Sequence, residues 1–421
     1  MNKMKIAFRL IILYATLQLA ASEEYAKDTL QAEYGEIIYA GLIFRHGNRV
    51  PDKFFPKDPN RNGSWPFELG QLVNKGKQRA FKLGKFFRPR YGHLVGKLYA
   101  PSKVITHASS YDRTLMSGIL FNAGFFPPSD HEIWNEELKW QPVPIHTSPA
   151  SLDNVLRLVN KPCARYTKLR DDFYEKGETI KKICVQYKDE VAYIEKETGF
   201  NLTPCRSYQS ILDLIYVQDT LLVETEQNFT LPEWTKKVYP HPLHSFRDSL
   251  FFTEVDDPRI KRLLAGPLLN VIASDMLNVA GRKNTLPKNM YTSEASKTPR
   301  LHLFAGHDIN VVIMLKTLGV YTNKAPNYSA AVGFELRKKA DKYYVTVVYE
   351  NSLDEPPQVL HIPHCNGVCT FEQFLSLVTP IIPENFDAEC NKLDDLGRHG
   401  NSGSIASIYN HYFTVPIPVP Q

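Results

Sequence analysis

Three short polar clusters in this sequence combine residue types that suit the chemistry of phosphate groups. Together they hold three arginines, two histidines and one aspartate: Arg45, His46, Arg49, Arg113, His307 and Asp308. Guanidinium groups bind phosphate oxygens in bidentate geometry and stabilise a phosphoryl group during its transfer. A neutral imidazole among them can attack phosphorus, and a protonated carboxyl group can protonate the departing oxygen. The residue types therefore indicate an anion-binding site suited to phosphoryl transfer, provided that the fold brings the clusters together.

Each cluster lies between a segment with the pattern of a strand and a segment with the pattern of a helix. Residues 36–44 (EIIYAGLIF) form a nearly continuous apolar run, which is typical of a strand covered on both faces. Residues 103–110 predict a second strand, and residues 300–320 predict a strand, a glycine turn and a helix. Such units favour a parallel sheet, and ligands bind beyond the carboxyl ends of its strands. We therefore expect all three clusters at that edge.

Each cluster also has a purely structural explanation. Residues 45–47 could form a solvated turn, and Arg113 could pair with Asp112. Asp308 could cap the following helix by accepting hydrogen bonds from backbone N–H groups. The shared position of the clusters at strand-to-helix junctions favours the functional interpretation. In that interpretation, Gly47 lets the backbone turn so that two guanidinium groups face one anion.

Other sequence signatures of phosphate chemistry are absent. No Cys-x5-Arg loop occurs, because Cys163 and Arg170 are one residue too far apart, and no Gly-x4-Gly-Lys-Ser/Thr loop occurs. Nor do Asp, His and Asn residues have the dense spacing of a two-metal site. We therefore expect catalysis without a metal ion or another cofactor.

Two further segments have clear local patterns. Residues 68–91 carry apolar side chains at helical spacing, and we expect this helix to stop at Pro89. Residues 330–351 predict a β-hairpin that turns at residues 340–342.

The middle of the chain differs in character from its two ends. At 421 residues, the chain exceeds the size at which a single core usually keeps growing. Residues 151–290 are charged and show helical periodicity, for example at residues 210–227. The predicted fold is therefore a mostly parallel α/β sheet flanked by helices, with an inserted α-helical cap. The core would comprise residues 30–150 and 291–400, and the cap residues 151–290.

The first 22 residues have the pattern of a secretory signal peptide. Lys3, Lys5 and Arg9 precede an apolar run of about a dozen residues, too short to span a membrane, and Ala20 and Ser22 suit cleavage. Without this segment the chain keeps 47 of its 50 basic side chains and all 45 acidic ones. This small net charge gives no reason to expect nucleic acid or a membrane as a partner. We expect a secreted protein, with the lysosome as a second destination.

Six cysteines, an even number, favour three disulfides in an exported protein: Cys163, Cys184, Cys205, Cys365, Cys369 and Cys390. Spacing alone leaves fifteen connectivities and suggests a local pair only for Cys365 and Cys369. These two cysteines, with His361 and His364, also have the spacing of zinc ligands, which is the alternative. Four Asn-X-Ser/Thr sequons are typical of a secreted glycoprotein: Asn62, Asn201, Asn228 and Asn327.

The sequence resembles the histidine acid phosphatases. RHGNRVP (residues 45–51) is similar to the R-H-G-x-R-x-P signature of that family, and GHD (residues 306–308) is similar to its second catalytic His-Asp. Four other segments are similar to the animal lysosomal, prostatic and insect venom acid phosphatases, the venom type being the nearest: residues 76–92, 109–117, 134–144 and 223–234. The resemblance covers residues 34–395, essentially the whole mature chain.

The resemblance implies a function, a role for each site residue and a fold. It implies a secreted, metal-independent acid phosphatase that hydrolyses small phosphomonoesters or phosphopeptides. His46 would attack phosphorus and become a phosphohistidine, and Asp308 would protonate the leaving group and then assist hydrolysis. The phosphate oxygens would be held by Arg45, Arg49, Arg113 and His307. The implied fold is a phosphoglycerate-mutase-like α/β core with an α-helical cap.

Some details depart from the family or stay open. Ile309 and Asn310 follow Asp308 where many relatives carry Thr, which concerns the orientation of the Asp308 carboxyl group. By chain order we expect two further disulfides, Cys184–Cys205 and Cys163–Cys390. Relatives are often dimers, so a homodimer is expected by analogy alone. The alternative functions are a catalytically silent secreted binding or venom protein on the same fold, and an inositol-phosphate-type phosphatase.

Overall fold

The computed structural model of this chain describes residues 30–157, 162–288, 290–291, 297–365 and 367–393. The expected signal peptide, residues 1–22, lies outside the described residues. Within the described ranges, no helix combines the length and the apolar character needed to cross a membrane.

A central eight-stranded sheet carries the site. Its strand order is β3-β2-β4-β1-β5-β6-β7, with β8 also paired to β6. The strands β3, β2, β4 and β1 run parallel, and the pairs from β1–β5 outward are antiparallel. The strand bounds are β1 Glu36–Arg45, β2 Val104–Ala108, β3 His146–Thr147, β4 Leu301–Gly306, β5 Ala331–Lys339, β6 Lys342–Glu350, β7 Gln358–Leu360 and β8 Cys369–Thr370. The hairpin predicted at residues 330–351 is β5–β6, so that prediction is confirmed.

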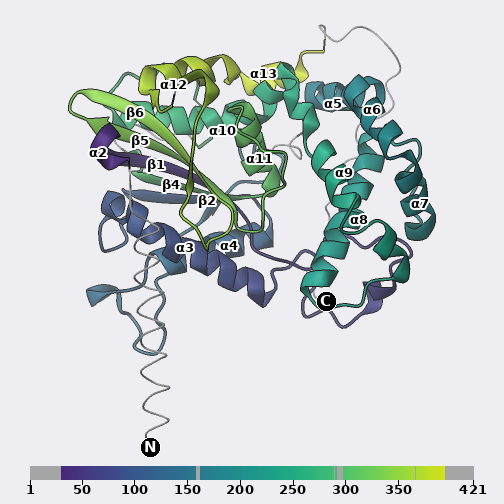
Figure 1. Ribbon diagram of the computed structural model, residues 1–421. Coiled ribbons are helices and arrows are strands. Elements are labelled where there is room, and N and C mark those ends of the chain that lie inside the picture. Colours follow the sequence, from purple (N-terminus) through teal and green to yellow (C-terminus); the bar gives the residue numbers. More distant parts are fainter. Residues whose placement is uncertain (1–29, 158–161, 289, 292–296, 366, 394–421) are drawn as a thin grey trace, which may run out of the picture.

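Helices cover both faces of the sheet, as Figure 1 shows. One face packs against α10 (Pro258–Val279), α11 (Asp308–Thr317) and α12 (Phe371–Val378), and the other against α3 (Asn74–Val95) and α4 (Asp112–Phe125). Each face has its own apolar core, because successive side chains of a strand point to opposite faces. The predicted α/β class, with a mostly parallel sheet flanked by helices, is confirmed. The other elements of these layers are α2 (Gln31–Tyr34), α13 (Phe386–Asn391), η1 (Pro59–Asn62), η2 (Asp130–Glu132), η6 (Pro363–Cys365) and η7 (Thr379–Ile381).

The prediction that a helix stops at Pro89 is wrong. Helix α3 begins at Asn74 and continues through Pro89 to Val95. Proline removes one backbone hydrogen bond, but the next two residues are held by tertiary contacts. Arg90 Nε and Tyr91 Oη donate to the buried Glu335 carboxylate of β5, at 2.6 and 2.9 Å. These contacts keep the last turns of α3 on the sheet despite the proline.

A cluster of helices lies to one side of the sheet (Figure 1). It contains α5 (Ala164–Lys176), α6 (Glu178–Gln186), α7 (Lys188–Thr198), α8 (Tyr208–Glu226) and α9 (Leu243–Leu250), with η3 (Glu233–Lys237) and η4 (Thr253–Asp256). Helices α6 to α9 enclose a third apolar core, which includes Leu214 and Phe246. We call residues 164–250 the helical lobe.

The end of the predicted cap at residue 290 stays a prediction. Helix α10 falls inside the range 151–290 that the sequence suggested for the cap, but its apolar side chains share a core with Tyr39, Ile43 and Phe304 of the sheet. We therefore propose that the cap ends before residue 258 and that α10 belongs to the α/β core.

The six cysteines form three disulfides: Cys163–Cys390, Cys184–Cys205 and Cys365–Cys369. These are the pairs expected from the sequence. The zinc alternative at His361, His364, Cys365 and Cys369 is wrong, because a disulfide leaves no thiolate to bind the metal. The asparagines of all four sequons, Asn62, Asn201, Asn228 and Asn327, are exposed.

Candidate active site

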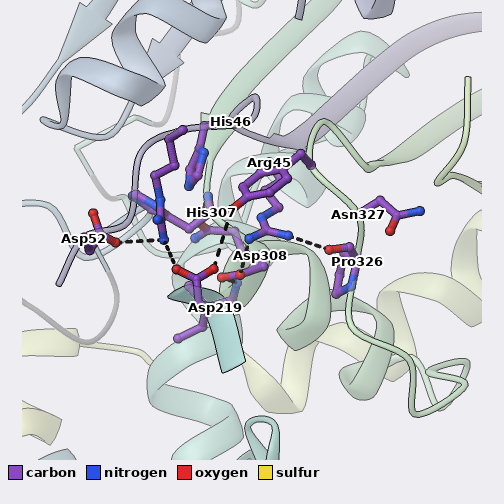
Figure 2. Close-up of polar contacts among 12 residues, drawn as sticks. Arg45, His46, Asp52, Asp219, His307, Asp308, Pro326 and Asn327 are labelled. Atoms are coloured by element: carbon purple, nitrogen blue, oxygen red, sulfur yellow. Dashed lines mark hydrogen bonds and ion pairs between the residues drawn. The ribbon is translucent and has the colours of Figure 1, made fainter. Parts of the chain in front are cut away.

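The register of the parallel strands brings the three clusters together. Arg45, the last residue of β1, lies beside Gly306, the last residue of β4. On the other side of β4, Ala108 of β2 lies beside Ala305. The residues that follow these strand ends therefore meet at one edge of the sheet, as the sequence predicted. Figure 2 shows Arg45, His46, His307 and Asp308 close together at this edge.

His46 is buried and held in one orientation. Its Nδ1 donates a hydrogen bond to the Gly47 carbonyl oxygen at 2.8 Å, since a carbonyl can only accept. Burial, reinforced by the positive charges of Arg113, Arg45 and Arg49, lowers the pKa of His46 well below its ordinary value. The ring is therefore neutral, with its proton on Nδ1 and a free electron pair on Nε2. This is the state that a nucleophilic imidazole requires.

The Arg45 guanidinium is fixed on three sides. Its Nη2 pairs with Asp308 Oδ2 at 3.0 Å, and its Nη1 donates to the Pro326 carbonyl oxygen at 2.7 Å. The guanidinium carbon lies 4.1 Å from the ring centre of Tyr328. These contacts hold Arg45 between His46 and Asp308, where it can bind the same phosphate group.

Two carboxylates that the sequence reasoning missed hold the other arginines. Arg49 Nη2 pairs with Asp52 at 2.9 Å and with Asp219 of α8 at 3.0 Å. Arg113 Nη1 pairs with the other oxygen of Asp52 at 3.2 Å. Asp52 thus orients both guanidiniums, and Asp219 joins the helical lobe to the site (Figure 2). The spacing of Asp52 three residues after Arg49 was a sequence signal, whereas nothing local distinguishes Asp219.

His307 lies beside His46. Its Nε2 is hydrogen-bonded to the Ser109 hydroxyl group at 2.9 Å, and its ring centre lies 5.5 Å from that of His46. Burial and the charges of Arg113 and Arg157 lower the pKa of His307 well below its ordinary value. Both histidines of the site are therefore neutral.

Asp308 is oriented by two groups. Its Oδ1 accepts from the Ile309 backbone N–H at 2.8 Å, and its Oδ2 pairs with Arg45. Burial raises the pKa of this carboxyl group, but the charges of Arg45 and Arg247 outweigh burial, so that its pKa lies below the ordinary value. Without a bound anion, Asp308 is ionised over most of the acidic range.

Asn310, which the sequence analysis connected with the orientation of Asp308, positions His307 instead. Its Oδ1 accepts from the His307 backbone N–H at 2.8 Å, and its Nδ2 donates to the Leu156 carbonyl oxygen at 3.3 Å. The side chain is fully buried. Asn310 therefore caps α11 and ties the segment before residue 158 to the site.

The structure gives a steric reason for glycine at position 47, while its predicted role in turning the backbone stays a prediction. Its φ is not positive. A Cβ at Gly47 would lie 2.3 Å from the Gly76 carbonyl oxygen at the start of α3, and a Cβ at Gly76 would lie 2.0 Å from the Asn48 carbonyl oxygen. The two glycines let the loop after β1 pack directly on the backbone of α3.

A cavity of about 610 Å³ opens from the site. Arg49, Arg113, His307 and Asp308 line it, together with three more arginines, Arg157, Arg170 and Arg247. Sequence reasoning missed these three as site residues, because they lie in segments with no motif. The arrangement can bind a phosphate group among arginines, attack it with a neutral imidazole and protonate a departing oxygen. Among the described residues, no three His, Cys, Asp or Glu side chains are grouped so as to hold a metal ion.

Comparisons with known proteins agree with this site. The family model for the histidine phosphatase superfamily (branch 2) matches residues 36–350. The chain is 32% identical over 369 residues to venom acid phosphatase Acph-1 of Apis mellifera, which covers 86% of this chain and 89% of that protein. It is 32% identical over 357 residues to the prostatic acid phosphatase of Homo sapiens, with 84% and 88% covered. Among solved structures, a phytase from Citrobacter braakii matches with a TM-score of 0.62 and 18% identity over 84% of this chain and 99% of that chain, which shows the fold alone.

Proposed function

The chain belongs to the histidine phosphatase superfamily (branch 2), and from this premise we propose that it is a metal-independent acid phosphatase that hydrolyses phosphomonoesters through a phosphohistidine on His46. The observation that carries the proposal is the state of His46. A buried, neutral imidazole, with Nδ1 bound to the Gly47 carbonyl oxygen, lies among three arginines.

The first step transfers the phosphoryl group to His46. Nε2 forms a bond to phosphorus while the bond from phosphorus to the ester oxygen breaks, and the proton of Asp308 goes to that oxygen. The nonbridging phosphate oxygens are held by Arg45, Arg49, Arg113 and His307. Because these groups are already oriented by Asp52, Asp219 and Ser109, little reorganisation is needed when charge develops.

The second step returns the enzyme to its starting state. Asp308, now ionised, takes a proton from water, whose oxygen attacks phosphorus and displaces Nε2. Inorganic phosphate leaves, Asp308 is again protonated and His46 is again neutral. Atoms and charge balance over the two steps, and no other reactant is required.

An acidic working range follows from the charge around Asp308. In the unliganded site, Arg45 and Arg247 hold the pKa of Asp308 below its ordinary value. A bound phosphate dianion engages the same guanidiniums and repels an ionised carboxylate, so it raises that pKa in the complex. The reaction needs protonated Asp308, so the rate should fall as pH rises through the pKa of the complex.

The decisive test replaces the nucleophile. His46→Ala should lower kcat for phenyl phosphate by at least about 10³-fold and abolish labelling of the protein by a radioactive phosphate donor after denaturation. His93→Ala, at a histidine on α3 whose Nε2 donates to the Ile37 carbonyl oxygen at the start of β1, is the matched control and should keep both. A labelled protein in the His46→Ala variant would contradict the assignment. If a chelator abolished turnover by the unmodified protein, the metal-independent mechanism would be contradicted. If the unmodified protein showed no turnover at any pH, the alternative of a catalytically silent binding protein would be supported instead.

We further propose that the protein is exported, N-glycosylated and homodimeric. The signal-peptide pattern of residues 1–22 and the three disulfides support export, and the exposure of the four sequon asparagines is compatible with glycosylation. Mass spectrometry of the secreted chain before and after glycosidase treatment tests the first two proposals. Sedimentation equilibrium tests the third.

A further inference from the structure

The cavity that begins at the catalytic cluster continues well beyond it, along helix α8. Asp219, which pairs with Arg49, marks the catalytic end, and Tyr208, in the first turn of α8, lines the cavity at its other end. Eleven residues separate them, which corresponds to about 16 Å along the helix axis at 1.5 Å per residue. A phosphate group occupies only the first few ångströms of such a path. The remainder of the path is open to the rest of a bound substrate.

The wall that α8 presents to this path is an apolar stripe. Tyr208, Leu212, Ile215 and Tyr216 recur at helical spacing, line the cavity and are only partly buried. The opposite side of α8, for example Leu214, is fully covered by the core of the lobe. Leu212 belongs to none of the three apolar cores of the described chain. Leu212 therefore leaves apolar surface on the cavity wall, beside Tyr208 and Ile215, which pack partly against the core of the lobe.

Further apolar side chains line the cavity. The ring centres of Phe251 and Phe252 lie 4.5 Å apart, and Ile309 follows Asp308 in the lining. The Arg247 guanidinium, which also lines the cavity, lies over the Phe251 ring, 4.6 Å from its centre. Phe252 has a φ of 52°, a left-handed conformation that is unfavourable for a residue with a side chain. Such a conformation persists where the surrounding structure requires it, and here it places a ring in the wall of the cavity.

The far end of the path is polar. Arg170 stacks on the Tyr208 ring, with its guanidinium carbon 3.8 Å from the ring centre, and its Nη2 pairs with Asp171 at 2.8 Å. Both residues line the cavity. The apolar stretch is thus bounded by charge at both ends, by the catalytic arginines and by this ion pair.

We propose that this path is a leaving-group channel, selective for phosphomonoesters of long apolar alcohols. The inference rests on the proposed function, because the channel starts beside Asp308, the group that would protonate the leaving oxygen. An alcohol that leaves from that position would extend along α8, where its apolar chain is removed from water between Leu212 and Phe252. A chain longer than about 16 Å would have to enter the polar end, so the benefit of added length should stop there.

The test is a series of unbranched alkyl phosphates, from methyl to dodecyl, each below its micelle-forming concentration. For each methylene that becomes fully buried, kcat/KM should rise by up to about fourfold. The rise should level off once the chain spans the channel. A kcat/KM that does not depend on chain length, while methyl phosphate is hydrolysed, overturns the channel and leaves the phosphatase proposal standing.

Two variants at Leu212 test whether the dependence of kcat/KM on chain length arises in this channel. Leu212→Trp fills the channel and Leu212→Asn makes its wall polar, so both should flatten the dependence of kcat/KM on chain length. Val185→Trp, at a side chain of α6 that is 69% exposed and outside the cavity lining, is the matched control and should keep the full dependence. Thermal melting of each variant shows whether it is folded. A full dependence in folded Leu212→Trp would overturn the assignment to this channel.

Binding without turnover separates the two proposals completely. Calorimetric titration of His46→Ala with the same alkyl phosphates measures Kd when no reaction takes place. The Kd of the variant should fall as the alkyl chain becomes longer, by about the same factor per methylene as kcat/KM rises in the unmodified protein. If the unmodified protein hydrolyses nothing, a Kd that still falls with length supports the channel, and a constant Kd overturns it.

Discussion

Asp308 depends on two neighbours for its orientation and its charge. The Ile309 N–H holds one carboxylate oxygen and Arg45 holds the other, while Arg45 and Arg247 keep the pKa of the carboxyl group low until an anion binds. The same arginine can bind phosphate and release the carboxyl group to take up a proton. The ion pair between Arg45 and Asp308 thereby couples acid catalysis to substrate binding.

Replacing Asp308 by Asn should affect substrates according to their leaving groups. The amide keeps the size of the side chain but cannot protonate the departing oxygen. For alkyl phosphates, whose alkoxides leave poorly, kcat should fall by about 10² to 10⁴-fold. For 4-nitrophenyl phosphate, whose phenolate leaves without a proton, the loss should be much smaller, and the falling limb of the pH profile should disappear. An equal loss for both classes would contradict the role of Asp308 as general acid, and stopped assays over a range of pH measure both.

The elements around the site are held by unusually close backbone packing. The loop after β1 lies on the first turn of α3, where neither Gly47 nor Gly76 has room for a Cβ. The backbone of Val73, just before α3, also donates to the Asn48 carbonyl oxygen at 3.0 Å. The position of His46 and Arg49 therefore depends on the position of α3.

Gly76→Ala tests this dependence. The added methyl group would lie 2.0 Å from the Asn48 carbonyl oxygen, so the loop and the helix must separate. We expect a loss of 1–3 kcal/mol in the free energy of unfolding, typical of overpacking, and a loss of roughly 10²-fold in kcat/KM. Gly92→Ala, at a site in the same helix where the nearest atoms are 3.4 Å away on a flexible side chain, is the control. Denaturant unfolding and phenyl phosphate kinetics measure the two effects, and equal behaviour of the two variants would refute the explanation.

Helix α8 is also joined to the loop after β1 by a pair of buried acids. Asp58 and Glu224 are 3% and 0% exposed and interact with one another. Burial, and then the charge of Asp58, raises the pKa of Glu224 to about 8, while burial raises that of Asp58. Asp58 also caps η1 by accepting from the Asn60 N–H. The pair can hold the loop against α8 only while it retains a proton.

The contribution of Glu224 to the stability of the protein should therefore fall as pH rises from about 4 to about 8. The folded state retains the Glu224 proton up to about pH 8, whereas the unfolded chain releases it at about 4.3. Between these values the folded state holds a proton on Glu224 that the unfolded chain has lost, so this group lowers the free energy of unfolding as pH rises. Glu224→Gln should remove this contribution and change the slope of the free energy of unfolding against pH, whereas Glu233→Gln, at an 83% exposed side chain, should not. Urea unfolding from pH 4 to 9 measures the slopes, and identical slopes in the two variants would contradict the prediction.

At the scale of the whole molecule, the helical lobe completes the site. Asp219 of α8 and Arg247 of α9 both line the cavity, and one disulfide connects the start of the lobe to the end of the described core. Cys163, just before α5, is bonded to Cys390 of α13 across a separation of 227 residues. The disulfide limits how far the lobe can move from the sheet.

Removing this disulfide should cost more stability than removing the local one. Closing so long a loop restricts the unfolded chain by about 5 kcal/mol, and the four-residue separation of Cys365 and Cys369 by about 2 kcal/mol. The double variant Cys163→Ala/Cys390→Ala should thus lose more free energy of unfolding than Cys365→Ala/Cys369→Ala. Denaturant unfolding compares them, and an equal loss would show that strain or residual structure, rather than loop length, decides the effect.

The sequence alone predicted which residues lie together in the site and that they follow the ends of strands. The three polar clusters follow β1, β2 and β4, and the carboxyl ends of parallel strands lie at one edge whatever the rest of the chain does. Local patterning also sufficed for the β5–β6 hairpin and for α8, because strand alternation and helical spacing are properties of neighbouring residues.

Only the tertiary structure decided the features that depend on contacts between distant segments. Helix α3 passes Pro89 because Glu335 of β5 holds the residues after it. The close approach of Gly47 to the backbone of α3, which leaves no room for a Cβ, has no signal in the local sequence. Asp219 and the apolar stripe of α8 became visible as parts of the site only once the lobe was folded against the sheet. A sequence pattern reports the neighbours along the chain, whereas Asp219, the second carboxylate that pairs with Arg49, lies 170 residues away along the chain.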